Sequence, residues 1–257
     1  MIYGEFAGVY DELMSTIPYE TWFAHIDRYL REHGIGPDSG TICELGCGTG
    51  TMTELFAGAG YRMVGVDLSE EMLALARKKM EKSGSDILYI HQDMENLELA
   101  EPVEAVLCLC DSINYILEES ALDKVFAGVR KYLKPGGLFL FDMKTLYCYR
   151  TVMGNDTWFI RRGDINCVWQ NYVYEDEKIN EYRLTVFQKE HDSQLYKKFH
   201  EAHYQRIYEV KEMKALLKRS GFKVEACLDG HMWGRPAKDC ERVYIIARKS
   251  EKGAARE

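Results

Sequence analysis

Residues 41–69 read TICELGCGTGTMTELFAGAGYRMVGVDLS, and the rest of the chain is organised around this stretch. The pattern predicts a strand, a glycine-rich turn at 46–50, a helix over 51–58 and a second strand over 61–66. Glycines let the backbone turn sharply and let a ligand approach it closely. Asp67 follows the second strand, where its carboxylate can accept hydrogen bonds from both hydroxyls of a ribose.

The glycine spacing distinguishes between classes of nucleotide cofactor. A dinucleotide fingerprint is G-x-G-x-x-G, with a phosphate at the helix N-terminus. Here the glycines run G-x-G-x-G from Gly46 to Gly50, and Glu44 precedes them. A carboxylate so close to the loop repels a pyrophosphate and suits an ammonium group. The spacing therefore favours a cofactor with a ribose at one end and an amino acid at the other.

The segment Glu44-Leu45-Gly46-Cys47-Gly48-Thr49-Gly50 resembles the first motif of the class I S-adenosylmethionine (SAM) dependent methyltransferases, E/D-x-G-x-G-x-G. Leu-Lys-Pro-Gly-Gly at 133–137 is similar to a second, structural signature of that family. The resemblance covers about residues 41–145 and 209–248. It implies SAM as cofactor and S-adenosylhomocysteine (SAH) as product. The implied fold is α/β, with a Rossmann-like seven-stranded, mostly parallel sheet that carries helices on both faces.

The resemblance also implies where the cofactor lies. Asp67 would hold the ribose, with Leu68 and Met72 near the adenine, and Asp93 would accept a hydrogen bond from the adenine amine. The expected cofactor-binding residues are Tyr10, Glu44, Gly46, Cys47, Gly48, Gly50, Asp67, Leu68, Met72, Asp93, Met94, Cys110, Asp111 and Ser112.

Residues 1–40 are predicted to form a helical arm or lid ahead of the first strand. Phe6, Tyr10 and Leu13 recur at helical spacing, and Pro18 fits the start of a second helix. Phe-Ala-x-x-Tyr-Asp at 6–11 resembles the family's arm, whose tyrosine reaches the methionine end of the cofactor. We therefore expect Tyr10 to lie over the cofactor.

Residues 103–110 form the most continuously apolar run, which suits a central parallel strand covered on both faces. The run ends in Asp111-Ser112-Ile113-Asn114-Tyr115, and the end of such a strand is where an open α/β sheet places its chemistry. We expect Asp111, Ser112, Asn114 and Tyr115 to orient the methyl acceptor, with Tyr10 near the methyl group. The expected catalytic residues are Tyr10, Asn114 and Tyr115.

From about residue 147 to 208 the alternation of strand and helix stops, and several strand-like segments follow one another. We predict an antiparallel β-sheet inserted into a SAM-binding domain of residues 41–146 and 209–249. This subdomain, residues 147–208, would serve substrate binding or dimerisation, and it is a candidate surface for a homodimer. Candidates for the wall around the acceptor are Tyr3, Trp158, Trp169, His203, Tyr204 and Trp233.

Composition excludes several classes of partner. The 257 residues carry a formal charge of −8, and nucleic-acid binding requires clustered cations, so no nucleic-acid partner is expected. The sequence shows no signal-peptide pattern and no apolar run of membrane-spanning length, so we expect a cytoplasmic protein without a membrane partner.

The eight cysteines form no C-x-x-C pair, which indicates reduced thiols. His200 and His203 should point to opposite faces of a strand, and no metal is expected.

The Asp-Ser-x-Asn-Tyr segment, the Phe-Asp-Met strand end at 141–143 and the inserted sheet look most like small-molecule N-methyltransferases, such as the glycine, sarcosine and aminosugar enzymes. The expected function is transfer of a methyl group from SAM to a small-molecule acceptor, an amine nitrogen, by in-line displacement. The alternatives are an RNA methyltransferase and a non-catalytic SAM-binding module. A nicotinamide oxidoreductase is disfavoured by the glycine spacing and Glu44. The sequence does not name the acceptor.

Overall fold

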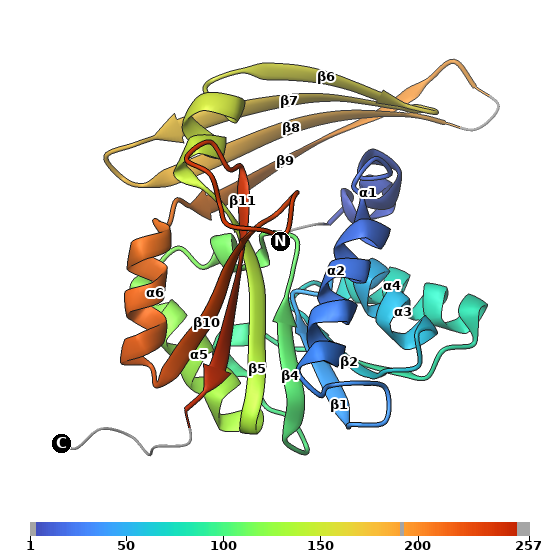
Figure 1. The fold of residues 1–257 in the computed structure, drawn as a ribbon. Helices are drawn as coiled ribbons and strands as arrows, with labels where there is room; N and C mark the ends of the chain where they lie inside the picture. Colours follow the sequence, from blue (N-terminus) through green and yellow to red (C-terminus); the bar gives the residue numbers. More distant parts are fainter. Residues whose placement is uncertain (1–3, 191–192, 251–257) are drawn as a thin grey trace.

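A computed structural model describes residues 4–190 and 193–250 of the chain, and it contains two β-sheets, the smaller one above the strand ends of the larger (Figure 1). The larger sheet has seven strands in the order β10-β11-β5-β4-β1-β2-β3. All neighbouring pairs from β5 to β3 are parallel, whereas β11 is antiparallel to both β5 and β10. The strands are β1 (Thr41–Leu45), β2 (Arg62–Asp67), β3 (Ile87–His91), β4 (Val103–Cys108), β5 (Leu133–Lys144), β10 (Phe222–Asp229) and β11 (Arg242–Lys249).

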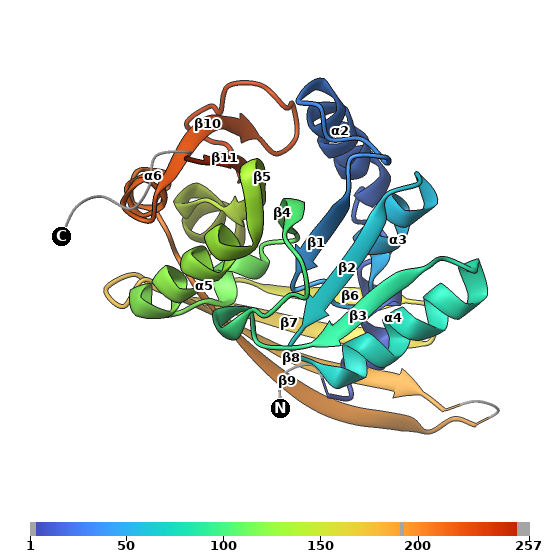
Figure 2. The same cartoon turned by 90° about the horizontal axis from the view of Figure 1, so that it is seen from below.

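Helices cover both faces of this sheet (Figure 2). One face carries α5 (Glu119–Tyr132) and α6 (Val210–Arg219), and the other carries α2 (Tyr19–Glu32), α3 (Thr51–Gly58) and α4 (Glu70–Ser83). Strand β4 contributes Val106 to the first core and Leu107 to the second, so it is buried on both sides. The predicted Rossmann-like fold is therefore confirmed. None of the described helices is long and apolar enough to cross a membrane.

The second sheet lies across the carboxyl ends of the parallel strands (Figure 1). Its strands, β6 (Thr157–Arg162), β7 (Ile165–Tyr174), β8 (Ile179–Lys189) and β9 (Tyr196–Arg206), pair in chain order, and every pair is antiparallel. The predicted insertion of an antiparallel sheet is confirmed. Helix α1 (Ala7–Leu13) packs on this sheet rather than on the larger one. The segment predicted as a single helical arm thus divides between the two sheets.

Strand β5 includes the Leu-Lys-Pro-Gly-Gly segment. Leu133 pairs with Val103 and the next pair is Leu138 with Ala105, so the residues between them bulge out. Beyond β5, a short π-helical turn, η3 (Cys148–Met153), leads into the inserted sheet. The sequence did not predict this turn.

A buried asparagine joins the two sheets. Asn114, in the short 3-10 turn η2 (Ser112–Tyr115), is fully buried. Its side-chain nitrogen donates to the Arg206 carbonyl at 2.9 Å, and its side-chain oxygen accepts from the Lys144 backbone N–H at 3.2 Å. One amide therefore connects β5, β9 and the end of β4.

Replacing Asn114 by alanine should leave a buried carbonyl and a buried N–H without partners. We expect the Asn114→Ala variant to lose about 1 to 3 kcal/mol of unfolding free energy, measured by urea denaturation. An unchanged denaturation midpoint would contradict this account of the junction.

Candidate active site

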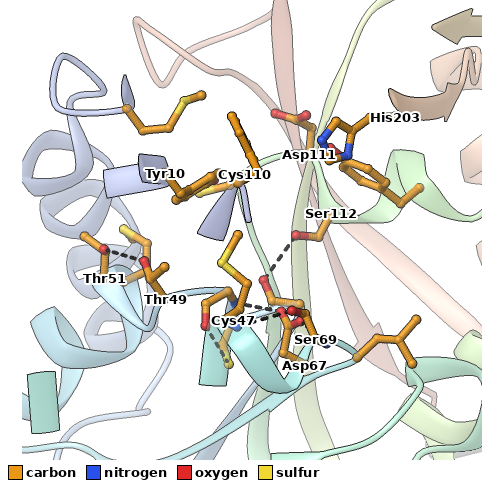
Figure 3. Close-up of a pocket in the computed structure, with 18 of the residues that line it drawn as sticks. Tyr10, Cys47, Thr49, Thr51, Asp67, Ser69, Cys110, Asp111, Ser112 and His203 are labelled. Atoms are coloured by element: carbon orange, nitrogen blue, oxygen red, sulfur yellow. Dashed lines mark hydrogen bonds between the residues drawn. The ribbon is translucent and has the colours of Figure 1, made fainter. Parts of the chain in front are cut away.

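A cavity of about 920 Å³ lies between the carboxyl ends of the parallel strands, helix α1 and the inserted sheet (Figure 3). The structure places every predicted cofactor-binding or catalytic residue except Gly50 and Asn114 in its wall. Residues that are far apart in sequence, such as Tyr10, Asp67 and Tyr115, are therefore brought together as expected. Residues lining the cavity that the sequence did not single out include Tyr19, Trp22, Lys144, Arg162, Tyr182 and Arg242.

The glycine-rich loop shapes one wall of the cavity. Gly46 has a φ of +66°, and an added Cβ would lie 2.7 Å from the Ser112 hydroxyl oxygen, so only glycine fits there. Gly50 has a φ of +75°, and an added Cβ would lie 2.3 Å from the Tyr89 hydroxyl oxygen. Gly50 therefore serves the turn and the packing on β3, and it is not among the residues that line the cavity.

Asp67 fastens this loop to the end of β2. One carboxylate oxygen accepts the Gly48 backbone N–H at 2.7 Å, and the other accepts the Ser69 backbone N–H at 2.8 Å. Burial raises the pKa of Asp67 despite these bonds, but each oxygen keeps a further lone pair. Because Asp67 lines the cavity, its carboxylate can accept two more hydrogen bonds from neighbouring hydroxyls.

Glu44 lies deeper, at the end of β1. It is 2% exposed and accepts a hydrogen bond from the Thr53 hydroxyl at 2.5 Å. Burial raises the pKa of Glu44 to about 8, although the Thr53 hydroxyl opposes this shift. A cation that enters the cavity beside Glu44 would favour its ionised form.

The third acidic group of the cavity follows β3. Asp93 accepts the Glu95 backbone N–H at 2.9 Å and begins the short 3-10 turn η1 (Met94–Asn96). Met94, Leu68 and the buried Met72 lie in the same part of the wall, which offers apolar surface for a flat ring. Glu44, Asp67 and Asp93 thus make this end of the cavity acidic.

The opposite end is built around Asp111, which follows β4. Its carboxylate accepts hydrogen bonds from Lys144 at 2.5 Å, Arg242 at 2.6 Å and Gln205 at 2.7 Å. Burial alone would raise the pKa of Asp111, but Lys144 and Arg242 outweigh burial and lower it to about 2. Asp111 is therefore an ionised partner of two cations near neutral pH and is unsuited to take up a proton during a reaction there.

The backbone at Asp111 is unusual. Cys110 and Asp111 have φ values of +58° and +53°, and neither residue is glycine. Strained backbone of this kind persists where the surroundings fix it, and it is concentrated at functional sites. Here the Asp111 backbone N–H donates to Asp142 at 2.9 Å, and the three side-chain donors hold the carboxylate.

Two of the proposed orienting residues have different roles. Ser112 lines the cavity, but its hydroxyl donates to the Leu109 carbonyl at 2.7 Å. Asn114 does not line the cavity, and its side-chain nitrogen donates to the Arg206 carbonyl at the junction with β9. Tyr10 and Tyr115 both line the cavity, and burial raises the pKa of Tyr10 well above its ordinary value. Tyr10 is therefore a neutral phenol.

Only some of the residues predicted to form the wall around the acceptor line the cavity. Trp169 and His203 line the cavity, and burial lowers the pKa of His203 to about 4, so its ring is neutral at pH 7. Trp158 is not in the cavity wall, and Tyr204 is 45% exposed on the outer face of the inserted sheet. Trp233 stacks on His25 with ring centroids 5.1 Å apart. Tyr3 lies outside the described residues.

His200 and His203 point to opposite faces of β9, as predicted: His200 is exposed and His203 is buried. Across residues 4–190 and 193–250, no three His, Cys, Asp or Glu side chains are placed to hold a metal ion.

Comparison with known proteins identifies relatives that share this fold. A family model described as "Methyltransferase domain" matches residues 42–137. The crystal structure of a SAM-dependent methyltransferase from Clostridium acetobutylicum superposes with a TM-score of 0.86 at 28% identity, covering 96% of this chain and 99% of that one. The Bacillus subtilis protein YqeM, which is named as a methyltransferase, is 34% identical over 252 residues, 98% of each chain. The chain therefore belongs to the class I SAM-dependent methyltransferases, and SAM is its cofactor.

A more distant relative has a defined substrate in its name. The dTDP-3-amino-3,4,6-trideoxy-alpha-D-glucopyranose N,N-dimethyltransferase of Streptomyces venezuelae is 30% identical over 107 residues, which cover 41% of this chain and 43% of that enzyme.

The ion pairs of Asp111 predict a pH-dependent contribution to stability. Because the pKa of Asp111 is lower in the folded chain than its ordinary value of 3.8, its ionised form stabilises the fold above about pH 4. That contribution is lost as the pH falls toward 2. We expect Asp111→Asn to lower the unfolding free energy at pH 7 by about 3 kcal/mol, since it leaves two buried cations less well paired. In urea denaturation, the difference from wild type should shrink between pH 4 and pH 2, and a constant difference would contradict the assignment.

Proposed function

We propose that this methyltransferase transfers the methyl group of SAM to an amine nitrogen of a small molecule held beneath the inserted sheet. The observation that carries the proposal is the closure of the site by that sheet and by helix α1. A cavity of about 920 Å³ is of the size that encloses small ligands, and it is not an open groove for a polymer. The aminosugar N,N-dimethyltransferase relative supports nitrogen as the acceptor atom.

The residues at the acidic end fit the cofactor. Asp67 has lone pairs for the two ribose hydroxyls, and Glu44 offers a carboxylate to the ammonium group of the methionine part. Asp93, beside Met94, Leu68 and Met72, offers an acceptor for the adenine amine within an apolar wall. When bound, SAM supplies an electrophilic methyl group on a positively charged sulfur.

The protein's own contribution is alignment and exclusion of water. Tyr10 and Tyr115 line the cavity, and aromatic faces favour a nearby positive charge by roughly 0.5 to 2 kcal/mol. The inserted sheet covers the opening with Trp169, Tyr182 and Leu184. Holding two reactants in line in a dry cavity can lower the barrier by several kcal/mol.

Among the described residues at the acceptor end, Asp111, His203 and Tyr10 are poorly suited to accept a proton near neutral pH. The pKa of Asp111 is held at about 2 by Lys144 and Arg242, that of His203 is lowered to about 4 by burial, and burial raises the pKa of Tyr10. Lys144 and Arg242 already pair with Asp111 and Asp142, so this network leaves no uncompensated carboxylate to hold an ammonium group. An amine that enters in its neutral, nucleophilic form needs no general base there.

The direct test uses SAM with an isotopically labelled methyl group. The purified protein is incubated with separate small-molecule and RNA fractions of a cell extract, and mass spectrometry identifies which compound gains the label. We expect an amine-containing small molecule to be labelled. Labelled RNA, or SAM binding without transfer to any compound, would replace the proposal with one of the two alternatives.

Removal of the Asp67 carboxylate should weaken cofactor binding. We expect Asp67→Ala to bind SAH more weakly by about 1 to 3 kcal/mol in isothermal calorimetry, because two hydroxyl hydrogen bonds are lost and the loop is released from β2. Asp86→Ala, an exposed carboxylate just before β3, is the matched control and should bind as the wild type does. Equal SAH affinity of Asp67→Ala and wild type would show that the ribose does not bind at Asp67.

The raised pKa of Glu44 predicts pH-dependent binding. Below its pKa of about 8 the free carboxyl is protonated, so pairing with an ammonium group requires loss of that proton. SAH affinity should therefore increase from pH 6 to pH 7.5, by up to about tenfold per pH unit. Glu44→Gln should bind more weakly and without this slope. A flat profile for the wild type would show that Glu44 does not contact the ammonium group.

A further inference from the structure

Helix α1 belongs structurally to the inserted sheet. Phe6, Val9 and Leu13 on its apolar side share one core with Tyr182, Val186 and other residues of that sheet. The ion pair between Glu5 and Lys197 of β9 adds a polar tie within the same unit. The arm and the inserted sheet therefore form one cap above the larger sheet.

The polar side of α1 contacts the cofactor-binding part of the larger domain. One Asp11 oxygen accepts a hydrogen bond from the Thr49 hydroxyl at 2.6 Å, and the other pairs with the Lys79 ammonium at 2.7 Å. Lys79 also donates to the hydroxyls of Thr49 at 3.0 Å and Thr51 at 2.9 Å. Asp11 thus connects the cap to the glycine-rich loop and to α4.

Each element joined at this point also carries a residue of the cavity wall. Tyr10 precedes Asp11 on α1, Gly48 precedes Thr49 in the loop, and Met72 lies on α4 with Lys79. Figure 3 shows Thr49 and Thr51 on the same side of the cavity as Tyr10. A displacement of Asp11 from Thr49 and Lys79 would therefore move Tyr10 away from the loop.

Other polar connections between cap and larger domain lie around Asp111 and at α6, where Lys178 pairs with Glu212. Gln205 of β9 donates to Asp111 at 2.7 Å, and Asn114 donates to the Arg206 carbonyl. The chain itself enters the cap after β5 and leaves it after β9. The cap is thus attached permanently near the acceptor end, whereas near the loop it is held by Asp11.

We propose that Asp11, Thr49 and Lys79 form a latch that positions Tyr10 over the cofactor and opens when the cofactor is exchanged. Asp11 is a positioning residue, since it acts through the arm and is not itself in the cavity wall. The Asp11 and Lys79 side chains are 45% and 31% exposed, so their ion pair is weak enough to break repeatedly. The inference rests on the cofactor placement of the proposed function and is independent of the acceptor.

The test is the rate at which SAH leaves the protein, followed in a stopped-flow instrument by tryptophan fluorescence, because Trp22 and Trp169 line the cavity. We expect Asp11→Ala to release SAH about five- to tenfold faster than wild type, and Lys79→Met about two- to fivefold faster. The double variant should be no faster than Asp11→Ala alone, because both residues act in one latch. Added salt should speed release from the wild type and leave Asp11→Ala unchanged.

Glu5→Gln is the matched control. It removes an ion pair of the same arm, but that pair lies within the cap, so the release rate should stay at the wild-type value. Hydrogen exchange of residues 7–13 in the free protein gives a second readout, which should be faster in Asp11→Ala and unchanged in Glu5→Gln.

Wild-type release rates in Asp11→Ala and Lys79→Met would overturn the latch while leaving the proposed function intact. Equal acceleration by Glu5→Gln would also overturn it, because general loosening of the arm would then explain the effect. Failure of the wild type to bind SAH would overturn both proposals. If Asp11→Ala does not fold, Asp11→Asn and Thr49→Val carry the same test.

Discussion

The pairing of Asp111 with Lys144, Arg242 and Gln205 is the interaction on which the rest of the structure depends. These donors come from β5, β11 and the inserted sheet, so one carboxylate fixes the end of β4 to both neighbouring parts of the molecule. A buried charge is stable only when its partners stay in place. The network therefore sets the height of the cap above the strand ends, and with it the width of the cavity.

The charges of the cavity are divided between its two ends. Glu44, Asp67 and Asp93 make the cofactor end acidic, which suits a ligand with an ammonium group, a sulfonium and two hydroxyls. At the other end Lys144 and Arg242 pair with Asp111 and Asp142 and hold the pKa of Asp111 at about 2, and burial lowers the pKa of His203 to about 4. In the proposed function, this division orients a positively charged methyl donor and leaves the other end to a neutral nucleophile.

The sequence predicted what is local and missed what depends on distant contacts. The glycine-rich loop and Asp67 lie in one continuous stretch, and their spacing was sufficient to place them. Arg242 lies 131 residues from Asp111, and the two meet only because β11 inserts antiparallel beside β5. Knowledge of that strand order would have placed Lys144 and Arg242 at the same edge. The sequence did not reveal that Asn114 joins the two sheets, because a polar residue at a strand end can serve a junction as readily as a reaction.

The most direct measurement is a crystal structure of the protein with SAH. The account predicts the ribose hydroxyls within hydrogen-bonding distance of the Asp67 carboxylate, the amino group beside Glu44, and the sulfur facing the space between Tyr10 and Tyr115. A ligand bound elsewhere, or one whose sulfur points away from the space under the inserted sheet, would contradict it.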